Sequence, residues 1–374
     1  MTMTGQEALA LLEHEDILRL GQAANEMRNR IHGKELVTFI IDRNINYSNI
    51  CESECKFCAF YRRKGDKGAY LLPTETILEK VKETVACGGT QVMIQGGLHP
   101  DLELSYYTDL LRSIKKTADI TIHSFTPTEI VYWSKKSGYS VKEVLLRLQE
   151  AGLDSLPGGG AEILVDEIRK RVSPKKIMTD EWLGVMETAH SIGMQSTATM
   201  VIGLGETLAQ RIEHMEKVKA LQEKTGGFRA FITWTYQPGN TELGGEKTSA
   251  WDYLRTLATT RLYLDNIKHI QGSWVTTGQN IGQITLACGA NDLGSIMLEE
   301  NVVRAAGTAY EMSVNKMVRM IESAGKTAAQ RNTEYEILRT FDRKGGRYHG
   351  YGTSRICRYR RLGHTLEQLS ARCQ

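Results

Sequence analysis

Short apolar runs alternate with longer amphipathic segments along most of the chain. Residues 6–32 space their apolar side chains as one helix face requires, which predicts a leading amphipathic helix with Gly33 as its C-cap. The next runs are rich in β-branched and aromatic residues, and we expect strands at 36–42, 90–95, 120–124, 153–156, 196–202, 228–234, 272–277 and 292–297. Helical patterns separate these runs at 74–86, 103–116, 140–151, 179–192, 207–224 and 249–265.

This repeated order of strand and helix indicates a parallel sheet covered by helices. No Pro- or Ser-rich linker interrupts it before Phe341, so we expect one domain over residues 1–341 and a separate tail over 342–374. The number of strand and helix units predicts an α/β fold, a (β/α) TIM-type barrel with an N-terminal helix and a C-terminal helical extension. In such barrels the functional residues collect on the loops that follow the strands.

Composition and charge narrow the class of protein. Of the 374 residues, 41% are hydrophobic and 24% are charged, as in ordinary globular proteins, and no apolar run approaches the roughly 20 residues of a membrane span. The first residues have no basic stretch before their apolar region, so we expect no secretory signal and a cytoplasmic protein. The tail is strongly basic, and its composition favours a solvated, disordered end over a nucleic-acid or membrane surface.

Three cysteines stand close together in the loop after the first expected strand. Cys51, Cys55 and Cys58 have the spacing C-x3-C-x2-C. A structural zinc would need a fourth ligand at short spacing, yet the nearest histidines are His32 and His99. A thioredoxin-like pair would leave Cys51 unexplained. A [4Fe–4S] cluster usually takes four thiolates, so three would leave one iron open to an exchangeable ligand.

The spacing, with Phe57 before the last cysteine, resembles the signature of the radical S-adenosylmethionine (SAM) superfamily. The resemblance implies a barrel of the radical SAM kind in which Cys51, Cys55 and Cys58 bind a [4Fe–4S] cluster. It also implies that the open iron binds SAM and that reductive cleavage gives a 5′-deoxyadenosyl radical. A reducing partner such as flavodoxin or ferredoxin would then be needed.

The same resemblance implies cofactor contacts on neighbouring loops. "IQGGLHP" is similar to the family's glycine motif, so the backbones of Gly96 and Gly97 would meet the SAM amino group, although Leu98 stands where the family has Glu. The backbone of Phe60 would contact the adenine, and Glu162 would accept hydrogen bonds from the ribose hydroxyls. A tight turn without a ligand is an equally good reading of the two glycines.

Longer stretches resemble one branch of the superfamily. "SLPGGGAEIL", "TGGFRAFITW" and "GLHPDL" are similar to enzymes of the futalosine route to menaquinone and of deazaflavin synthesis. Within that branch, "MVIGLGET", "GSWVTTGQNIGQ" and "GANDLGS" resemble the cyclic dehypoxanthine futalosine synthases. The implied reaction is a cyclisation of dehypoxanthine futalosine: a hydrogen leaves C4′ of the ribose, the carbon radical adds to the benzoate ring, and loss of an electron and a proton restores aromaticity.

That last step would be helped by a base, and His99, Glu206 and Asp292 lie in suitable loops. Each has a structural alternative: a loop histidine bonded to backbone, a carboxylate at a helix start, and a turn residue. Candidates for hydrogen bonds to the substrate are Ser273, Thr276 and Gln283. Two other functions stay open, namely an aminofutalosine or deazaflavin synthase and a non-catalytic iron–sulfur or zinc protein that binds RNA.

Overall fold

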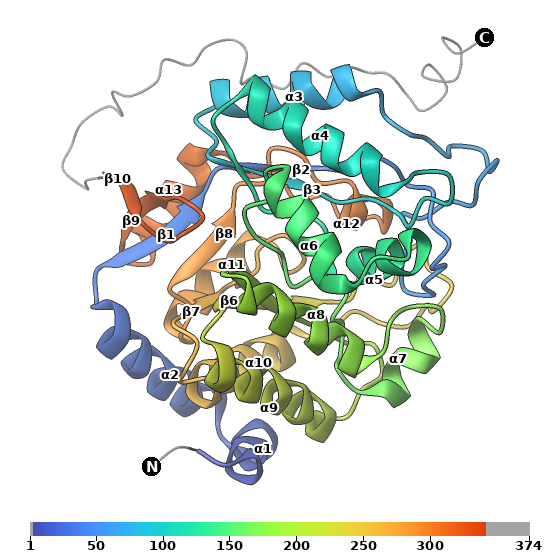
Figure 1. The fold of residues 1–374 in the computed structure, drawn as a ribbon. Helices are drawn as coiled ribbons and strands as arrows, with labels where there is room; N and C mark the ends of the chain where they lie inside the picture. Colours follow the sequence, from blue (N-terminus) through green and yellow to red (C-terminus); the bar gives the residue numbers. More distant parts are fainter. Residues whose placement is uncertain (1–2, 342–374) are drawn as a thin grey trace.

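The structure, a computed structural model, describes residues 3–341 and forms a closed barrel of parallel strands (Figure 1). Its strands are β1 (Leu36–Ile40), β2 (Asp42–Ile45), β3 (Gln91–Ile94), β4 (Thr121–Ile122), β5 (Ser196–Ile202), β6 (Phe228–Thr235), β7 (His269–Gln271) and β8 (Asp292–Ser295). β1 pairs with β8 and continues after one residue into β2, which pairs with β3. On the far side, the bridges His123–Ser155 and Leu156–Ser196 join β4 to β5. The ring is therefore complete, and the expected TIM-type barrel is confirmed.

Helices surround this ring in Figure 1. They are α3 (Thr74–Ala86), α4 (Leu104–Thr117), α5 (Pro127–Ser137), α6 (Val141–Glu150), α7 (Asp166–Val172), α8 (Thr179–Ser191), α9 (Leu208–Thr225), α10 (Ala250–Tyr263), α11 (Gln279–Ile284), η1 (Thr285–Ala287), α12 (Val302–Ala305) and α13 (Val314–Ser323). Local sequence sets their limits. α9, for example, begins with a capping box between Thr207 and Gln210 and ends at Gly226 in the left-handed conformation.

The prediction of one N-terminal helix was wrong at a single point. The segment forms α1 (Gly5–His14) and α2 (Ile17–His32), because the Asp16 side chain accepts hydrogen bonds from the backbone N–H groups of Leu18 and Arg19 and so starts a second helix. Gly33 is the C-cap, with φ of 73°, as expected. α2 packs along α10, and α1 contacts α9 and α10.

Two further expectations need correction, one about a strand and one about the C-terminal extension. Residues 272–277 form a turn after β7, where the backbone N–H of Gly278 bonds to the carbonyl of Trp274 at 2.8 Å. The C-terminal extension contains α12 and α13 as expected, but also β9 (Thr327–Arg331), parallel to β1, and β10 (Ile337–Phe341), antiparallel to β9. The expected tail, residues 342–374, lies outside the described residues, so the domain boundary at 341 stays a prediction.

The link between β9 and β10 closes the N-terminal end of the barrel. Its Tyr335 ring stacks on His269 with centroids 3.6 Å apart, and the Thr333 hydroxyl donates to Gln91 Oε1 at 2.8 Å. His269 and Gln91 are the first residues of β7 and β3. This link therefore forms a floor opposite the loops that carry the cysteines.

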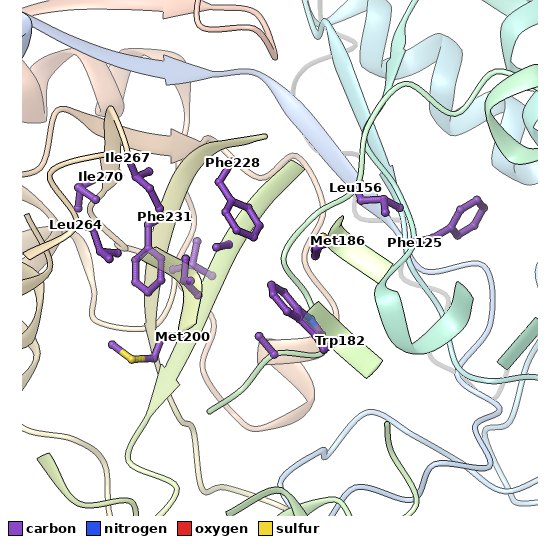
Figure 2. Packing of buried hydrophobic residues seen from close by; sticks show 14 of the residues in the cluster. Phe125, Leu156, Trp182, Met186, Met200, Phe228, Phe231, Leu264, Ile267 and Ile270 are labelled. Carbon is purple, nitrogen blue, oxygen red and sulfur yellow. The ribbon is translucent and has the colours of Figure 1, made fainter. Parts of the chain in front are cut away.

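Strand β6 shows how the barrel separates core from interior. Phe228 and Phe231 point outward into the layer of helices, where Trp182 of α8 stacks on Phe228 with centroids 6.3 Å apart (Figure 2). Burial of each such ring stabilises the fold by about 1.5–3 kcal/mol. Arg229, Ile232 and Trp234 line the interior cavity instead. A register shift near the start of β6 brings Arg229 onto the inner face.

Candidate functional site

A cavity of about 290 Å³ occupies the barrel interior. Among its lining residues are Asp42, Asn44, Met93, Gln95, Gly160, Glu162, Arg229, Trp234, Ser273 and Ser295. Three of the lining side chains bury a polar atom that has no hydrogen-bond partner among the described residues: Asn44 Oδ1, Glu162 Oε2 and Arg229 Nε. Buried polar groups are normally paired, so these atoms mark places where a ligand could bind.

The cysteine loop follows β2 and lies at the C-terminal end of the barrel. Its backbone is fixed at both ends of the motif, since the Cys51 N–H donates to the Arg62 carbonyl and the Cys58 N–H donates to the Cys55 carbonyl, both at 3.0 Å. Cys55 is buried, while Cys51 and Cys58 are partly buried. The loop therefore presents three thiols from one ordered segment.

The thiols lie in surroundings that oppose their ionisation. Burial raises the pKa of Cys55 to about 12, against the effect of Lys176, and burial also raises the pKa of Cys58. The backbone N–H of Leu98 donates to Cys51 Sγ at 3.3 Å. Thiols this hard to ionise become thiolates when they bind a metal, and N–H bonds to sulfur are typical of iron–sulfur sites.

Within residues 3–341, no three His, Cys, Asp or Glu side chains are close enough to share one metal ion. In a [4Fe–4S] cluster each thiolate binds a different iron, so the sulfurs stand farther apart than the ligands of a single ion. The donor set and its N–H contact fit such a cluster, and the ligand roles of Cys51, Cys55 and Cys58 stay predictions.

Gly96 and Gly97 seat the cysteine loop on β3. A Cβ on Gly97 would lie 2.0 Å from the Ile50 carbonyl oxygen, and one on Gly96 would lie 2.5 Å from the Tyr47 ring. Only glycine fits at either position. This close packing requires glycine at both positions even without a ligand, and contact with SAM stays a prediction. The Phe60 ring lies edge-on to Tyr70, with centroids 6.3 Å apart, and its role at the adenine stays a prediction.

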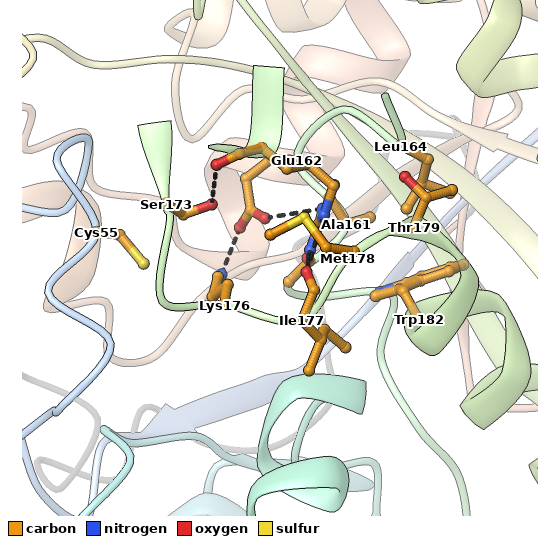
Figure 3. Close-up of polar contacts among 12 residues, drawn as sticks. Cys55, Ala161, Glu162, Leu164, Ser173, Lys176, Ile177, Met178, Thr179 and Trp182 are labelled. Atoms are coloured by element: carbon orange, nitrogen blue, oxygen red, sulfur yellow. Dashed lines mark hydrogen bonds and ion pairs between the residues drawn. The ribbon is translucent and has the colours of Figure 1, made fainter. Parts of the chain in front are cut away.

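Glu162 lies on the cavity wall in a left-handed conformation, with φ of 43°. Lys176 Nζ donates to Glu162 Oε1 at 2.7 Å, and Arg169 Nη1 lies 3.6 Å from Oε2. Figure 3 shows Lys176 between this carboxylate and Cys55. Two cations thus lie beside the Glu162 carboxylate, while Oε2 keeps an unused acceptor position. A ribose hydroxyl would satisfy that oxygen.

None of the three residues predicted as a base lines the cavity. His99 Nδ1 accepts a hydrogen bond from the backbone of Asp101 at 3.2 Å, and burial lowers its pKa. Glu206 accepts hydrogen bonds from the backbone of Gly203 at 2.9 Å and from Arg211 Nε at 2.8 Å. The contact of His99 matches its structural alternative, whereas Glu206 precedes the N-cap Thr207 of α9 and accepts hydrogen bonds from the preceding loop and from Arg211.

Asp292 makes a bidentate ion pair with Arg331, whose Nε and Nη2 lie 2.6 Å and 3.0 Å from its two oxygens. It also accepts hydrogen bonds from the Thr38 hydroxyl and the Gly294 backbone. With its acceptor positions used, this side chain holds β8, β1 and β9 together. The structure gives no support to a base role for any of the three residues.

Of the three predicted substrate contacts, some lie at the cavity and one lies away from it. Ser273 lines the cavity, and Thr276 lies behind it with the two hydroxyl oxygens 3.2 Å apart. Gln283 donates to the Met320 carbonyl at 2.7 Å and so packs α11 onto α13, away from the cavity.

Sequence reasoning missed several cavity residues that the strands themselves supply. Asp42 and Asn44 alternate along β2 and face inward. Asp42 accepts hydrogen bonds from Gln91 Nε2 at 2.7 Å and from the Ser295 hydroxyl. Burial raises its pKa to about 6. The sequence did contain a signal for these cavity residues. Both faces of a parallel strand are usually apolar, so polar residues at every second position, such as Asp42 and Asn44, indicate a polar interior.

Two family descriptions divide the chain between them. Residues 45–218 match "Radical SAM superfamily", and residues 225–344 match "CofH/MqnC C-terminal region". Among solved structures, methylornithine synthase (PylB) has a TM-score of 0.70 at 20% identity over 87% of this chain and 94% of its own. The hydrogenase maturase HydG of Carboxydothermus hydrogenoformans also reaches 0.70, at 18% identity over 89% of this chain and 77% of its own. These likenesses show the fold.

Curated relatives are much closer in sequence. The cyclic dehypoxanthine futalosine synthase of Halalkalibacterium halodurans is 48% identical over 91% of this chain and 92% of its own length. Its counterpart from Streptomyces coelicolor is 46% identical over 91% and 86%. The aminodeoxyfutalosine synthase of Thermus thermophilus is 36% identical over 90% and 93%. Among the described helices, none has the length and apolar character to cross a membrane. The chain belongs to the radical SAM superfamily and, within it, to the family of the cyclic dehypoxanthine futalosine synthases.

Proposed function

We propose that this enzyme converts dehypoxanthine futalosine to its cyclic form in the futalosine route to menaquinone. The observation that carries the proposal is the 48% identity, along 91% of the chain, to a synthase of that name. The cavity supports it, because its wall includes Glu162, whose partner Lys176 lies near Cys55 (Figure 3).

Cys51, Cys55 and Cys58 would hold the [4Fe–4S] cluster. The backbones of Phe60, Gly96 and Gly97 and the free oxygen of Glu162 would contact SAM, and a flavodoxin or ferredoxin would supply electrons. When bound, the cluster and SAM would supply the 5′-deoxyadenosyl radical needed for hydrogen abstraction from C4′ of the substrate.

The barrel interior would hold the two reacting carbons together. Met93, Ile232 and Trp234 give the cavity an apolar wall. An apolar wall helps to exclude water, and alignment of the ribose carbon with the ring lowers the entropic barrier to ring closure.

When the ring regains aromaticity it loses an electron and a proton. The electron would return to the oxidised cluster, and Asp42 is our candidate for the group that accepts the proton. It lines the cavity, and a carboxyl group with a pKa of about 6 is ionised at neutral pH yet basic enough to take a proton. Gln91 and the Ser295 hydroxyl would orient it through their hydrogen bonds.

A product assay separates this proposal from its nearest competitor. After anaerobic reconstitution with iron and sulfide, the enzyme would be given a reductant, SAM and dehypoxanthine futalosine. We expect equimolar 5′-deoxyadenosine and cyclised product. A product that retained adenine covalently, or turnover only with an enolpyruvyl benzoate, would favour an aminofutalosine synthase instead.

A further inference from the structure

Arg229 is a buried cation on the cavity wall with too few partners. Its side chain is 9% exposed, and its Nε has no hydrogen-bond partner among the described residues. Its Nη2 donates to the Ser155 hydroxyl at 2.8 Å. The nearest carboxylate, that of Glu334, lies 3.7 Å from Nη1 and is 48% exposed, so water weakens this pair.

Two charged groups on the cavity wall are paired at close range, while the Asp42 carboxylate accepts hydrogen bonds from Gln91 and Ser295. Arg331 has its bidentate pair with Asp292, and the carboxylate of Glu162 has Lys176. Arg229 differs, because burial lowers its pKa and only Glu334 and more distant groups oppose that effect. A guanidinium stays charged at any physiological pH, so it lies buried with one weak counterion. An anion from outside the chain would complete its pairing.

The neighbours of Arg229 would also suit an anion. The Ser155 hydroxyl lies 2.7 Å from His123 Nδ1 and so bridges the imidazole and the guanidinium. Burial, with Arg229 next, keeps the pKa of His123 well below its usual value, so His123 is neutral and does not supply the charge. Among these three side chains, Arg229 alone is cationic, and its planar fork matches a carboxylate.

The position of Arg229 in the barrel indicates which part of the substrate would supply this anion. Arg229 is the second residue of β6, near the barrel floor, whereas the cysteine loop and Glu162 lie at the opposite, C-terminal end of the strands. The cavity runs between them, since Glu162 and Arg229 both line it. A substrate that meets the cofactor end with its ribose would point its other end toward the floor.

We propose that Arg229 binds the carboxylate of the aryl carboxylate part of the substrate at the floor of the barrel. This inference rests on the proposed function. The ion pair anchors the ring that is attacked, so it sets which ring carbon faces the ribose radical. It also makes the enzyme select substrates whose aromatic ring carries a carboxylate.

The test combines a change in the protein with a matching change in the substrate. Arg229→Gln removes the positive charge, and Arg229→Lys keeps the charge but lacks the planar pair of N–H donors of the guanidinium. We expect Arg229→Gln to raise KM for dehypoxanthine futalosine about 10- to 100-fold, as loss of a charged hydrogen-bonded pair does, with a smaller fall in kcat. Arg229→Lys should recover part of the affinity. Arg112→Gln, an exposed arginine on α4, is the matched control and should change neither constant.

The carboxamide analogue of the substrate gives an independent measurement on the unaltered enzyme, with Arg229→Gln as a comparison. It should bind the unaltered enzyme about 10- to 100-fold more weakly than the carboxylate, and Arg229→Gln should bind both compounds alike. Equal affinity of the unaltered enzyme for the two compounds, while it still cyclises the natural substrate, would overturn the anion site and leave the proposed function standing. Absence of cyclised product from the unaltered enzyme would overturn both.

Discussion

Gly97 lies directly against Cys51. A Cβ placed on Gly97 would stand 2.7 Å from the Cβ of Cys51 and closer still to the carbonyl oxygen of Ile50. The next backbone N–H, that of Leu98, donates to the Cys51 sulfur. The loop after β3 therefore fixes the first cysteine of the motif by packing and by a hydrogen bond.

Substitution of Gly97 should accordingly act on the metal site. Gly97→Ala would push the cysteine loop away from β3, because the obstructing atoms are backbone and cannot move aside. We expect iron content after reconstitution to fall by more than half and stability to fall by about 1–3 kcal/mol. Gly184→Ala, at an open position within α8, is the control and should be neutral or slightly stabilising. Full iron content in Gly97→Ala would contradict the packing role.

The predicted cluster ligands can be compared with a buried cysteine outside the motif, Cys288. Replacement of Cys51, Cys55 or Cys58 by Ala should reduce reconstituted iron from about four per chain to near zero. Cys288→Ala removes a buried thiol that packs against Gly21 and should keep its iron. Iron analysis and the visible absorption spectrum report the result, and retention of iron in the three variants would sink the assignment.

Glu162 should matter for SAM and not for iron. Glu162→Gln removes the charge that pairs with Lys176 and alters the free acceptor, so we expect the Kd for SAM to rise about tenfold with iron content unchanged. Equilibrium dialysis with labelled SAM measures the effect. Glu167→Gln, on the exposed side of α7, serves as the control. An unchanged Kd would argue against a ribose contact.

The raised pKa of Asp42 predicts a specific pH dependence of the free energy of unfolding. Its pKa is raised from 3.8 to about 6, so the folded state binds the proton more tightly than the unfolded state does. Its contribution therefore favours folding at low pH and is lost as pH rises from about 4 to about 6. Asp42→Asn should flatten this part of the stability curve, measured by urea denaturation. In the active enzyme, cyclised product per 5′-deoxyadenosine should rise with pH through about 6 and should be low in Asp42→Asn.

Periodicity predicted much of the fold because barrel strands and helices have distinct patterns. The expected strand at 196–202 and the expected helix at 74–86 match β5 and α3. The break at Asp16 depends on side-chain capping within one continuous apolar pattern, which periodicity does not register. The run at 272–277 has strand-forming residues, but its contacts after β7 favour a turn, so tertiary packing overrides propensity.

The site was harder to predict than the fold. The cysteines could be found because their ligand spacing is local in sequence. Glu206 and Asp292 were chosen for their loop positions, yet each is occupied by an arginine from another element, and such partners appear only after folding. Arg229 lies inside the apolar run "FRAFITW". A charged residue is unusual within a buried parallel strand, so it could have indicated a binding residue in the barrel interior.

Isotope transfer from the substrate tests the central claim most directly. With deuterium at C4′ of dehypoxanthine futalosine and unlabelled SAM, mass spectrometry of the recovered 5′-deoxyadenosine reports which hydrogen was taken. The account predicts one deuterium per 5′-deoxyadenosine and a cyclised product that has lost it. Unlabelled 5′-deoxyadenosine formed alongside cyclised product, or adenine joined to the product, would contradict abstraction at C4′ within this barrel.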